Sequence, residues 1–200
     1  MKLNKKEHYG KPVIAPVNGS VNSMVEMLGR FVTDDKTRYY MTGIYLEPGE
    51  GDAVNCVATD GKRLAITVIG KSYLPKNLEL PGIYIITSDK YYNTFYPVEG
   101  TFPNYRRVMP DTENMELWGT RLNIEYRKKN TQLTDISHEL VHFLLWARQP
   151  FNLQYFLDFY PGKYTVYAPH DRGNDHCKAF VFDSNIEELK IILMPMIFSR

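Results

Sequence analysis

The most reactive pattern in the sequence is His138-Glu139-Leu140-Val141-His142, an H-E-x-x-H string. On a helix, His138 and His142 would lie on one face at i and i+4, as a zinc ion requires, and Glu139 could act as a general base. A complete site needs a third ligand. The candidates are Asp158, His170 and His176.

The alternative interpretation of the same string is a structural helix. Leu140, Phe143, Leu144 and Ala147 fall at helical spacing and predict a core face, which turns the histidine pair away from the core. The zinc peptidase or zinc-binding hypothesis therefore stays a second reading. We find no phosphate-binding glycine loop and no nucleophile elbow, and we expect no cofactor.

A second stretch, residues 57–66, places a basic pair between two apolar runs. Asp60-Gly61 predicts a tight bend, because glycine adopts positive φ without steric cost. We expect Lys62 and Arg63 to be exposed, and Leu64 and Ile66 to return to a buried face by strand alternation.

This stretch resembles the middle-domain signature of the bacterial DNA sliding clamp, the beta subunit of DNA polymerase III. Three further segments resemble clamp segments in the same order: residues 38–47, residues 102–110, and Met194-Pro195-Met196 near the end. The resemblance implies an α+β sliding-clamp fold and a non-enzymatic processivity factor of DNA replication or repair.

In clamps an apolar pocket receives short Leu/Phe peptides from DNA polymerases, the clamp loader and repair proteins. The resemblance assigns peptide binding to Met41, Thr59, Gly61, Lys62, Arg63, Leu64, Pro103, Arg107, Val108, Met194, Pro195 and Met196. Methionine adapts to varied ligands. Two departures stand out: Lys62 replaces a residue that is often histidine in clamps, and Phe198 lies beyond the usual end and could cover the pocket.

A clamp holds double-stranded DNA by positive charge on its inner helices. The two predicted helices offer little such charge, namely Arg30 beside Glu26, and Arg148. Arg106 adds a cation in a predicted turn, so DNA contact is only weakly supported by the charges.

Composition bounds the class of protein. The chain has 200 residues, a net charge of +1, 15 tyrosines and 10 phenylalanines, which favours a strand-rich fold. Only two cysteines, Cys56 and Cys177, and the lack of a signal-type start predict a cytoplasmic protein with reduced thiols. No apolar stretch predicts a membrane span.

The hydrophobic pattern predicts two halves, each a helix with an antiparallel sheet. We expect helices over residues 20–32, with Asn18 or Ser20 as N-cap, over 136–148, with Asp135 as N-cap, and over 151–160. The expected strands are residues 38–47, 54–69, 83–86, 115–128, 163–168, 177–183 and 188–197, with 88–101 left open.

Together these halves would make about one clamp domain over residues 1–200. Residues 12–110 resemble the middle domain, and residues 111–200 resemble the end of the last domain. In the family, three domains form a chain and two chains close a ring around DNA. We expect this chain to lack the first domain, which leaves open whether it forms a homo-oligomeric ring or only keeps the peptide pocket as an interaction or decoy protein.

Overall fold

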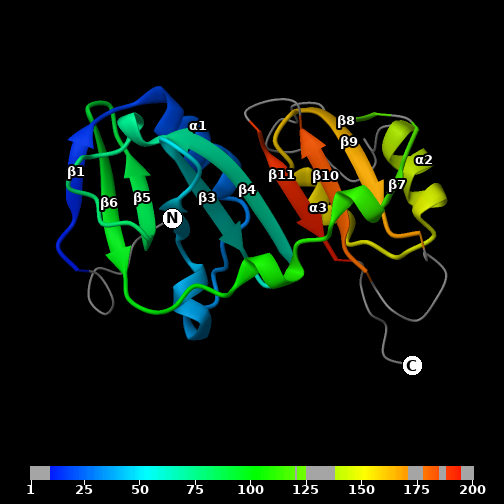
Figure 1. The fold of residues 1–200 in the computed structure, drawn as a ribbon, viewed down its shortest axis with the longest axis horizontal. Coiled ribbons are helices and arrows are strands. Elements are labelled where there is room, and N and C mark those ends of the chain that lie inside the picture. Colours follow the sequence, from blue (N-terminus) through cyan, green and yellow to red (C-terminus); the bar gives the residue numbers. More distant parts are fainter. Residues whose placement is uncertain (1–9, 120, 125–137, 171–177, 185–187, 195–200) are drawn as a thin grey trace. The chain divides into compact units, whose positions relative to one another are not determined.

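A computed structural model describes residues 10–119, 121–124, 138–170, 178–184 and 188–194 (Figure 1). The chain divides into two compact units, Met1–Pro103 and Asn104–Arg200. Each unit combines antiparallel strands with one or two α-helices, as the α+β prediction requires. The boundary predicted from the sequence lies at residues 110/111, a few residues later.

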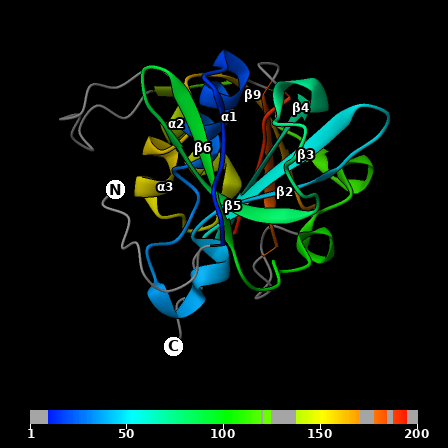
Figure 2. The same cartoon turned by 90° about the vertical axis from the view of Figure 1, so that its left-hand side faces the viewer.

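The first unit is a six-stranded antiparallel sheet with the order β1-β6-β5-β2-β3-β4. In Figure 2, β2 and β3 can be followed as a hairpin beside β5. The strands are β1 (Val13–Pro16), β2 (Ile44–Pro48), β3 (Ala53–Thr59), β4 (Arg63–Gly70), β5 (Gly82–Ser88) and β6 (Tyr92–Val98). From its length, the segment between Pro75 and Phe102 is expected to be too short for a second helix and sheet; it forms no helix, but it does supply two strands of the sheet, β5 and β6, so the second part of this expectation is wrong.

One helix, α1 (Gly19–Leu28), packs on β3 and β4 of this sheet (Figure 1). The predicted cap is confirmed: the Asn18 side chain accepts hydrogen bonds from the backbone N–H groups of Ser20 and Val21. Met24 and Leu28 lie at i and i+4 and are fully buried, so the predicted apolar stripe is the face that meets the sheet. The helix ends at Leu28 with Gly29 as its C-cap, in agreement with a predicted end between Gly29 and Val32.

The predicted strand over residues 38–47 is wrong in its first half. Residues Lys36–Met41 form a 3₁₀ helix, η1, and β2 begins only at Ile44. The Asp35 carboxylate accepts a hydrogen bond from the Thr37 N–H, which starts a helical turn at this point. This local capping overrides the strand preference of the aromatic residues that follow.

The second unit contains β7 (Glu116–Leu117), β8 (Leu122–Ile124), β9 (Gly162–Ala168), β10 (Phe180–Ser184) and β11 (Lys190–Leu193). They pair in the order β11-β10-β9-β7, and β8 also pairs with β9. The helices are α2 (His138–Ala147) and α3 (Leu153–Leu157), with short 3₁₀ turns η3 (Tyr105–Val108) and η4 (Thr112–Asn114) before β7; η2 (Lys71–Tyr73) belongs to the first unit.

Aromatic rings fill the core of this second unit. The Phe143 ring on α2 lies with its centroid 5.4 Å from Phe182, 5.9 Å from Phe156 and 6.0 Å from Phe180. These pairs meet edge to face, the arrangement that the ring quadrupoles favour. Helices α2 and α3 and strand β10 are therefore joined through one aromatic cluster.

The remaining sequence predictions for this unit are met in part. The strand expected over residues 115–128 is two short strands, β7 and β8, within the residues described. Asp135, predicted to cap α2, lies outside the described residues, as does Cys177.

The other cysteine belongs to the first unit. Cys56 is buried in β3, and this burial raises the pKa of its thiol to about 12. Among the described residues, no helix is long and apolar enough to span a membrane.

Candidate functional site

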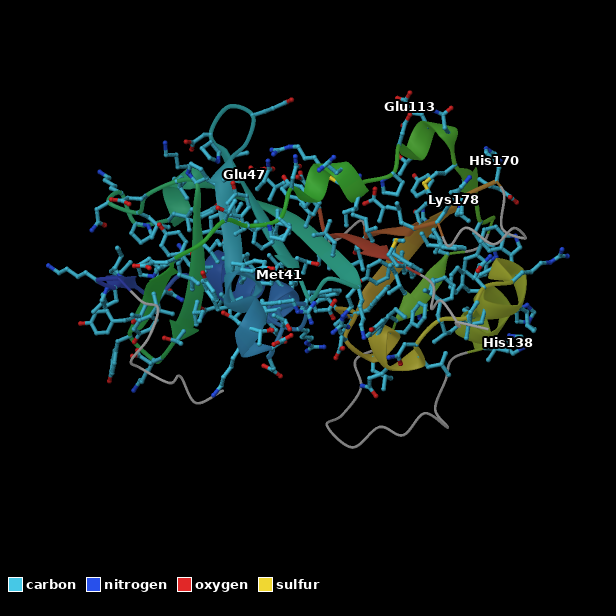
Figure 3. All side chains as sticks on the ribbon, turned by 90° about the horizontal axis from the view of Figure 1, so that it is seen from below. Met41, Glu47, Glu113, His138, His170 and Lys178 are labelled. Atoms are coloured by element: carbon cyan, nitrogen blue, oxygen red, sulfur yellow. The ribbon has the colours of Figure 1, made fainter. Side chains whose placement is uncertain are left out.

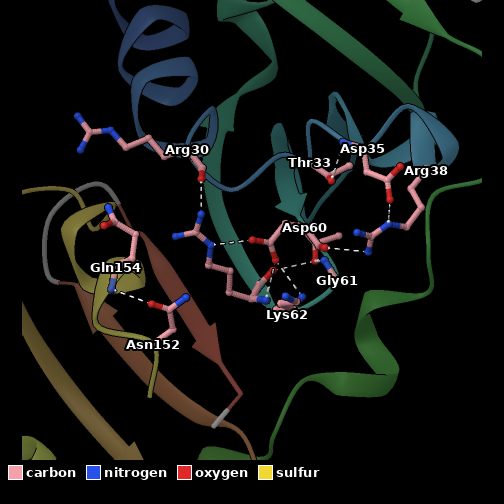
Figure 4. A network of polar contacts seen from close by, with 11 residues as sticks. Arg30, Thr33, Asp35, Arg38, Asp60, Gly61, Lys62, Asn152 and Gln154 are labelled. Atoms are coloured by element: carbon pink, nitrogen blue, oxygen red, sulfur yellow. Dashed lines mark hydrogen bonds and ion pairs between the residues drawn. The ribbon is translucent and has the colours of Figure 1, made fainter. Parts of the chain in front are cut away.

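The β3–β4 connection is the tight turn predicted from Asp60-Gly61 (Figure 4). One Asp60 carboxylate oxygen accepts the backbone N–H groups of Lys62 at 2.9 Å and Arg63 at 3.0 Å. Gly61 has a φ of +87°, which a side chain would strain. Thr59 completes the turn, since its hydroxyl accepts the Gly61 N–H and donates to the Arg63 carbonyl.

The prediction that Arg63 is exposed is wrong, because its side chain is only 8% accessible. Its Nε donates to the second Asp60 carboxylate oxygen at 2.9 Å, and its Nη2 donates to the Arg30 carbonyl oxygen at 2.8 Å. The guanidinium also lies over the Phe31 ring, 5.0 Å from its centroid. A buried cation needs such partners to offset the loss of water, so Arg63 anchors the turn to the segment after α1.

A second arginine supports the same turn from η1. The Arg38 guanidinium donates from Nη1 to the Asp60 carbonyl oxygen at 3.1 Å and from Nε to the Asp35 carboxylate at 2.9 Å. A Cβ placed on Gly61 would lie 2.9 Å from Arg38 Nη1 and 3.8 Å from the Met41 methyl group. Met41, predicted for the peptide site, is therefore a close neighbour of the turn (Figure 3).

The first unit thus brings together most of the predicted peptide-binding residues that it contains. Thr59 and Leu64 pair across the β3–β4 ladder, and both are buried with Met41. Gly61 and Lys62 form the exposed tip. The turn therefore combines buried Met41 and Leu64 side chains with the exposed Lys62 ammonium group and the buried Arg63 guanidinium.

The other predicted residues divide between the units. Pro103, the last residue of the first unit, is exposed. In the second unit Arg107 and Val108 lie on η3, and Val108 is 56% accessible. Met194 follows β11 and is 38% accessible, whereas Pro195, Met196 and Phe198 lie outside the described residues.

The three arginines predicted to contact DNA lie in different surroundings. Arg30 lies 3.9 Å from the Glu26 carboxylate, and both side chains are partly exposed. Arg106 lies over the Tyr105 ring, 5.0 Å from its centroid. Arg148 follows α2, is exposed, and has a φ of +54°.

The two histidines on α2 lie close together, as predicted, but the described residues do not complete a metal site around them. His138 and His142 are exposed, and their ring centroids lie 4.3 Å apart. Figure 3 labels His138 on α2. Leu140, Phe143 and Ala147 form the buried face of α2, as predicted for the structural reading; Leu144 is only partly buried. In the part of the chain that is described, no three His, Cys, Asp or Glu side chains come together in a way that could hold a metal. The zinc hypothesis has no support here.

The sequence analysis did not predict that Arg38 and Arg63 stabilise the β3–β4 turn through hydrogen bonds to Asp60. A signal was present, because Asp35 precedes Arg38 and Asp60 precedes Arg63 at the same spacing. Both pairs form an Nε–carboxylate contact of 2.9 Å, while the same aspartates accept backbone N–H groups two residues on. Such an Asp-x-x-Arg repeat predicts a capped turn with an arginine folded back on it.

Comparison with known proteins identifies the fold. No protein-family model matches the chain. The chain is 26% identical over 153 residues to the beta sliding clamp of Treponema pallidum (strain Nichols), which covers 64% of this chain and 41% of that protein. The alignment thus spans less than half of this curated relative.

Solved structures agree over almost the whole chain. The DNA polymerase III subunit beta of Pseudomonas aeruginosa aligns with a TM-score of 0.60 and 13% identity, over 99% of this chain and 69% of that one. A sliding clamp from Bartonella birtlesii, solved bound to griselimycin, aligns with a TM-score of 0.55 and 17% identity, over 98% and 68%. The chain has the sliding-clamp fold and resembles the bacterial clamp in sequence.

The turn geometry predicts the effect of Gly61→Ala. A non-glycine residue in the left-handed region costs about 1–2 kcal/mol, so we expect the free energy of unfolding to fall by about that amount. Urea unfolding followed by circular dichroism measures it. Gly19→Ala is the matched control, because a Cβ on Gly19 meets no atom within 4 Å. Equal stability of the two variants would contradict the strained turn.

The Asp35 cap predicts an acid dependence. Hydrogen bonds from the Thr37 hydroxyl and N–H, and then from Arg38, lower the pKa of Asp35 to about 2. A depressed pKa stabilises the fold above the unfolded value of about 4, and this contribution is lost as the pH falls from about 4 to about 2. We expect Asp35→Asn to remove this part of the pH dependence of the urea midpoint, and Asp34→Asn, at an exposed neighbour, to retain it.

Proposed function

Because this chain has the fold of bacterial DNA sliding clamps, we propose that it is a clamp-like, non-enzymatic accessory protein of DNA replication or repair. Its proposed activity is to bind short Leu/Phe-containing peptides of DNA polymerases, clamp loaders or repair proteins. The observation that carries the proposal is the rigid β3–β4 turn, because it holds the sequence most similar to the clamp signature in one fixed shape.

The residues proposed to contact the peptide come from both units of the chain. From the first unit come the apolar floor of Met41, Thr59 and Leu64, the tip of Gly61 and Lys62, and Pro103. The second unit contributes Arg107, Val108, Met194, Pro195 and Met196. Met41 and Met194 suit a site that accepts varied peptides, since the thioether side chain adapts to different shapes. Ligand binding by a similar fold supports this idea, as the Bartonella clamp was solved with griselimycin bound.

The charged residues of this surface take different roles in the proposal. Arg63 is buried and bonded to Asp60 and Arg30, so it positions the turn and does not reach for the peptide. Lys62 and Arg107 are exposed, so they are the cations available to peptide carbonyl groups and acidic side chains. Peptides with an acidic residue beside the Leu/Phe pair should therefore bind more tightly.

A second candidate function is a peptide-binding protein that does not encircle DNA. It is favoured by the charges of the first unit, where α1 carries only Glu26 and the nearby Arg30 is paired with it. A helix that faces the phosphate backbone needs unpaired cations. The two candidates share the peptide site and differ in assembly and DNA contact.

Peptide binding is tested by fluorescence anisotropy with a labelled peptide that contains an acidic residue and a Leu-Phe pair. We expect Val108→Asp to weaken binding by about tenfold or more, because a carboxylate buried without a partner costs well over 1 kcal/mol. Met194→Ala should weaken it by up to about tenfold through lost apolar contact. Arg63→Ala is less informative, since it removes a buried ion pair and would destabilise the fold.

Val141→Asp is the matched control for Val108→Asp, because Val141 is an exposed valine on α2, 42% accessible, outside the proposed surface. It should bind the peptide like the unmodified protein. The proposed site is wrong if the peptide fails to bind, or if Val141→Asp and Val108→Asp weaken binding equally.

The assembly is tested by light scattering of the purified protein with and without double-stranded DNA. From the paired arginines we expect the mass of the protein peak to be unchanged by DNA at physiological salt. A stable protein–DNA complex, or a closed oligomer that appears with DNA, would favour the encircling clamp over the second candidate.

A further inference from the structure

The first unit contains a cavity that lies apart from the β3–β4 turn. Its volume is about 380 Å³, and it lies where β5 begins and β6 ends, beside the segment that follows β6. The residues that matter for its chemistry are Glu79, Pro81, Pro97, Val98, Glu99 and Phe102. None of the residues predicted for peptide, DNA or metal binding lines this cavity.

The walls of the cavity are fixed by aromatic contacts. The Tyr45 and Phe102 rings stack, with centroids 4.8 Å apart and planes 5° from parallel. The buried Tyr84 side chain donates its hydroxyl to the backbone carbonyl oxygen of Glu79, which ties the segment before β5 to the sheet. The cavity is therefore built on the rigid sheet, with prolines and Val98 as further apolar wall.

The charge of the cavity has one sign. Glu79 and Glu99 are its two ionisable carboxylates, both are exposed, and no Lys, Arg or His lines it. The pKa of Tyr84 is raised, first by burial and then by the negative charge of Glu79, so this carboxylate acts on the cavity wall. The neighbouring cavity around Leu74 and Leu78 differs, because Lys71 and Lys76 line it together with Asp52.

We propose that this cavity is a docking site for a basic side chain, Arg or Lys, of a partner protein. Such a side chain has an apolar stem and a cationic head, which suits a cavity lined by aromatic rings, prolines and Val98 together with two carboxylates. A negatively charged ligand would be repelled by Glu79 and Glu99, which are both exposed. The site would add a second, charge-selective contact for partner proteins, and it does not depend on the proposed peptide site.

The test uses the full-length protein, labelled with ¹⁵N, and a short peptide with one arginine flanked by glycines. We expect peptide-dependent shifts at the backbone amides of Gly82, Gly100 and Thr101, which line the cavity. The same peptide with citrulline in place of arginine is isosteric and neutral, so it should cause no shifts there. The shifts should weaken as salt is raised.

Two variants and one matched control separate the cavity from general acidity. Glu79→Gln and Glu99→Gln should each weaken binding by about two- to fivefold, the range for partly exposed ion pairs. Glu50→Gln, on the exposed β2–β3 turn, should leave it unchanged. The proposal fails if millimolar peptide gives no shifts at these amides, if citrulline binds as well as arginine, or if Glu50→Gln weakens binding equally. It also fails if spermidine shifts these amides and the peptide does not, because the site would then serve a free polyamine.

Discussion

The ion pair between Asp60 and Arg63 is the constraint on which the candidate site depends. The Asp60 carboxylate bonds to two backbone N–H groups and to the Arg63 guanidinium at once. The guanidinium continues to the Arg30 carbonyl oxygen and over Phe31. One side chain therefore closes the turn, and its partner ties that turn to the segment after α1.

This arrangement holds in one shape a turn, which is usually the most mobile part of a hairpin. The entropy of ordering the turn is offset within the first unit, before any ligand binds. Removing either partner would leave a buried charge without compensation, which costs more than the pair itself contributes. The Asp60 carboxylate and the Arg63 guanidinium therefore determine both the shape of the turn and its stability.

Much of the fold follows from local sequence signals. Asn18 caps α1, Asp60-Gly61 makes a turn, and the apolar stripe that contains Phe143 predicts α2. These signals act over one to four residues, so the sequence contains them fully. One failure involves a distant partner: Arg63 was expected in solvent because its acceptor, the Arg30 carbonyl, lies 33 residues away. The other failure is local, since residues 38–41 lost their predicted strand to a turn that Asp35 starts just before them.

The candidate site was predictable only as a set of segments. The resemblance named Met41, Thr59 and Leu64, and the structure places Met41 beside the turn and pairs the other two across the hairpin. The residue type alone does not tell whether a side chain is available to a ligand or stabilises the turn. Arg63 and Lys62 are adjacent cations, yet one is buried and bonded while the other is exposed.

The same distinction bears on DNA. Arg30, Arg38 and Arg63 are the three arginines in the described part of the first unit, and each has a carboxylate three or four residues earlier in the chain within 4 Å. Arg38 and Arg63 use their charges to hold the β3–β4 turn, whereas Arg30 and Glu26 form a partly exposed pair at 3.9 Å. A cation beside a carboxylate adds little to the long-range field that would attract a polyanion. The chain carries 24 Lys and Arg residues against 23 Asp and Glu residues, which gives the net charge of +1. In the described part of the first unit, the two arginines that support the β3–β4 turn therefore act within the fold, through neighbouring carboxylates.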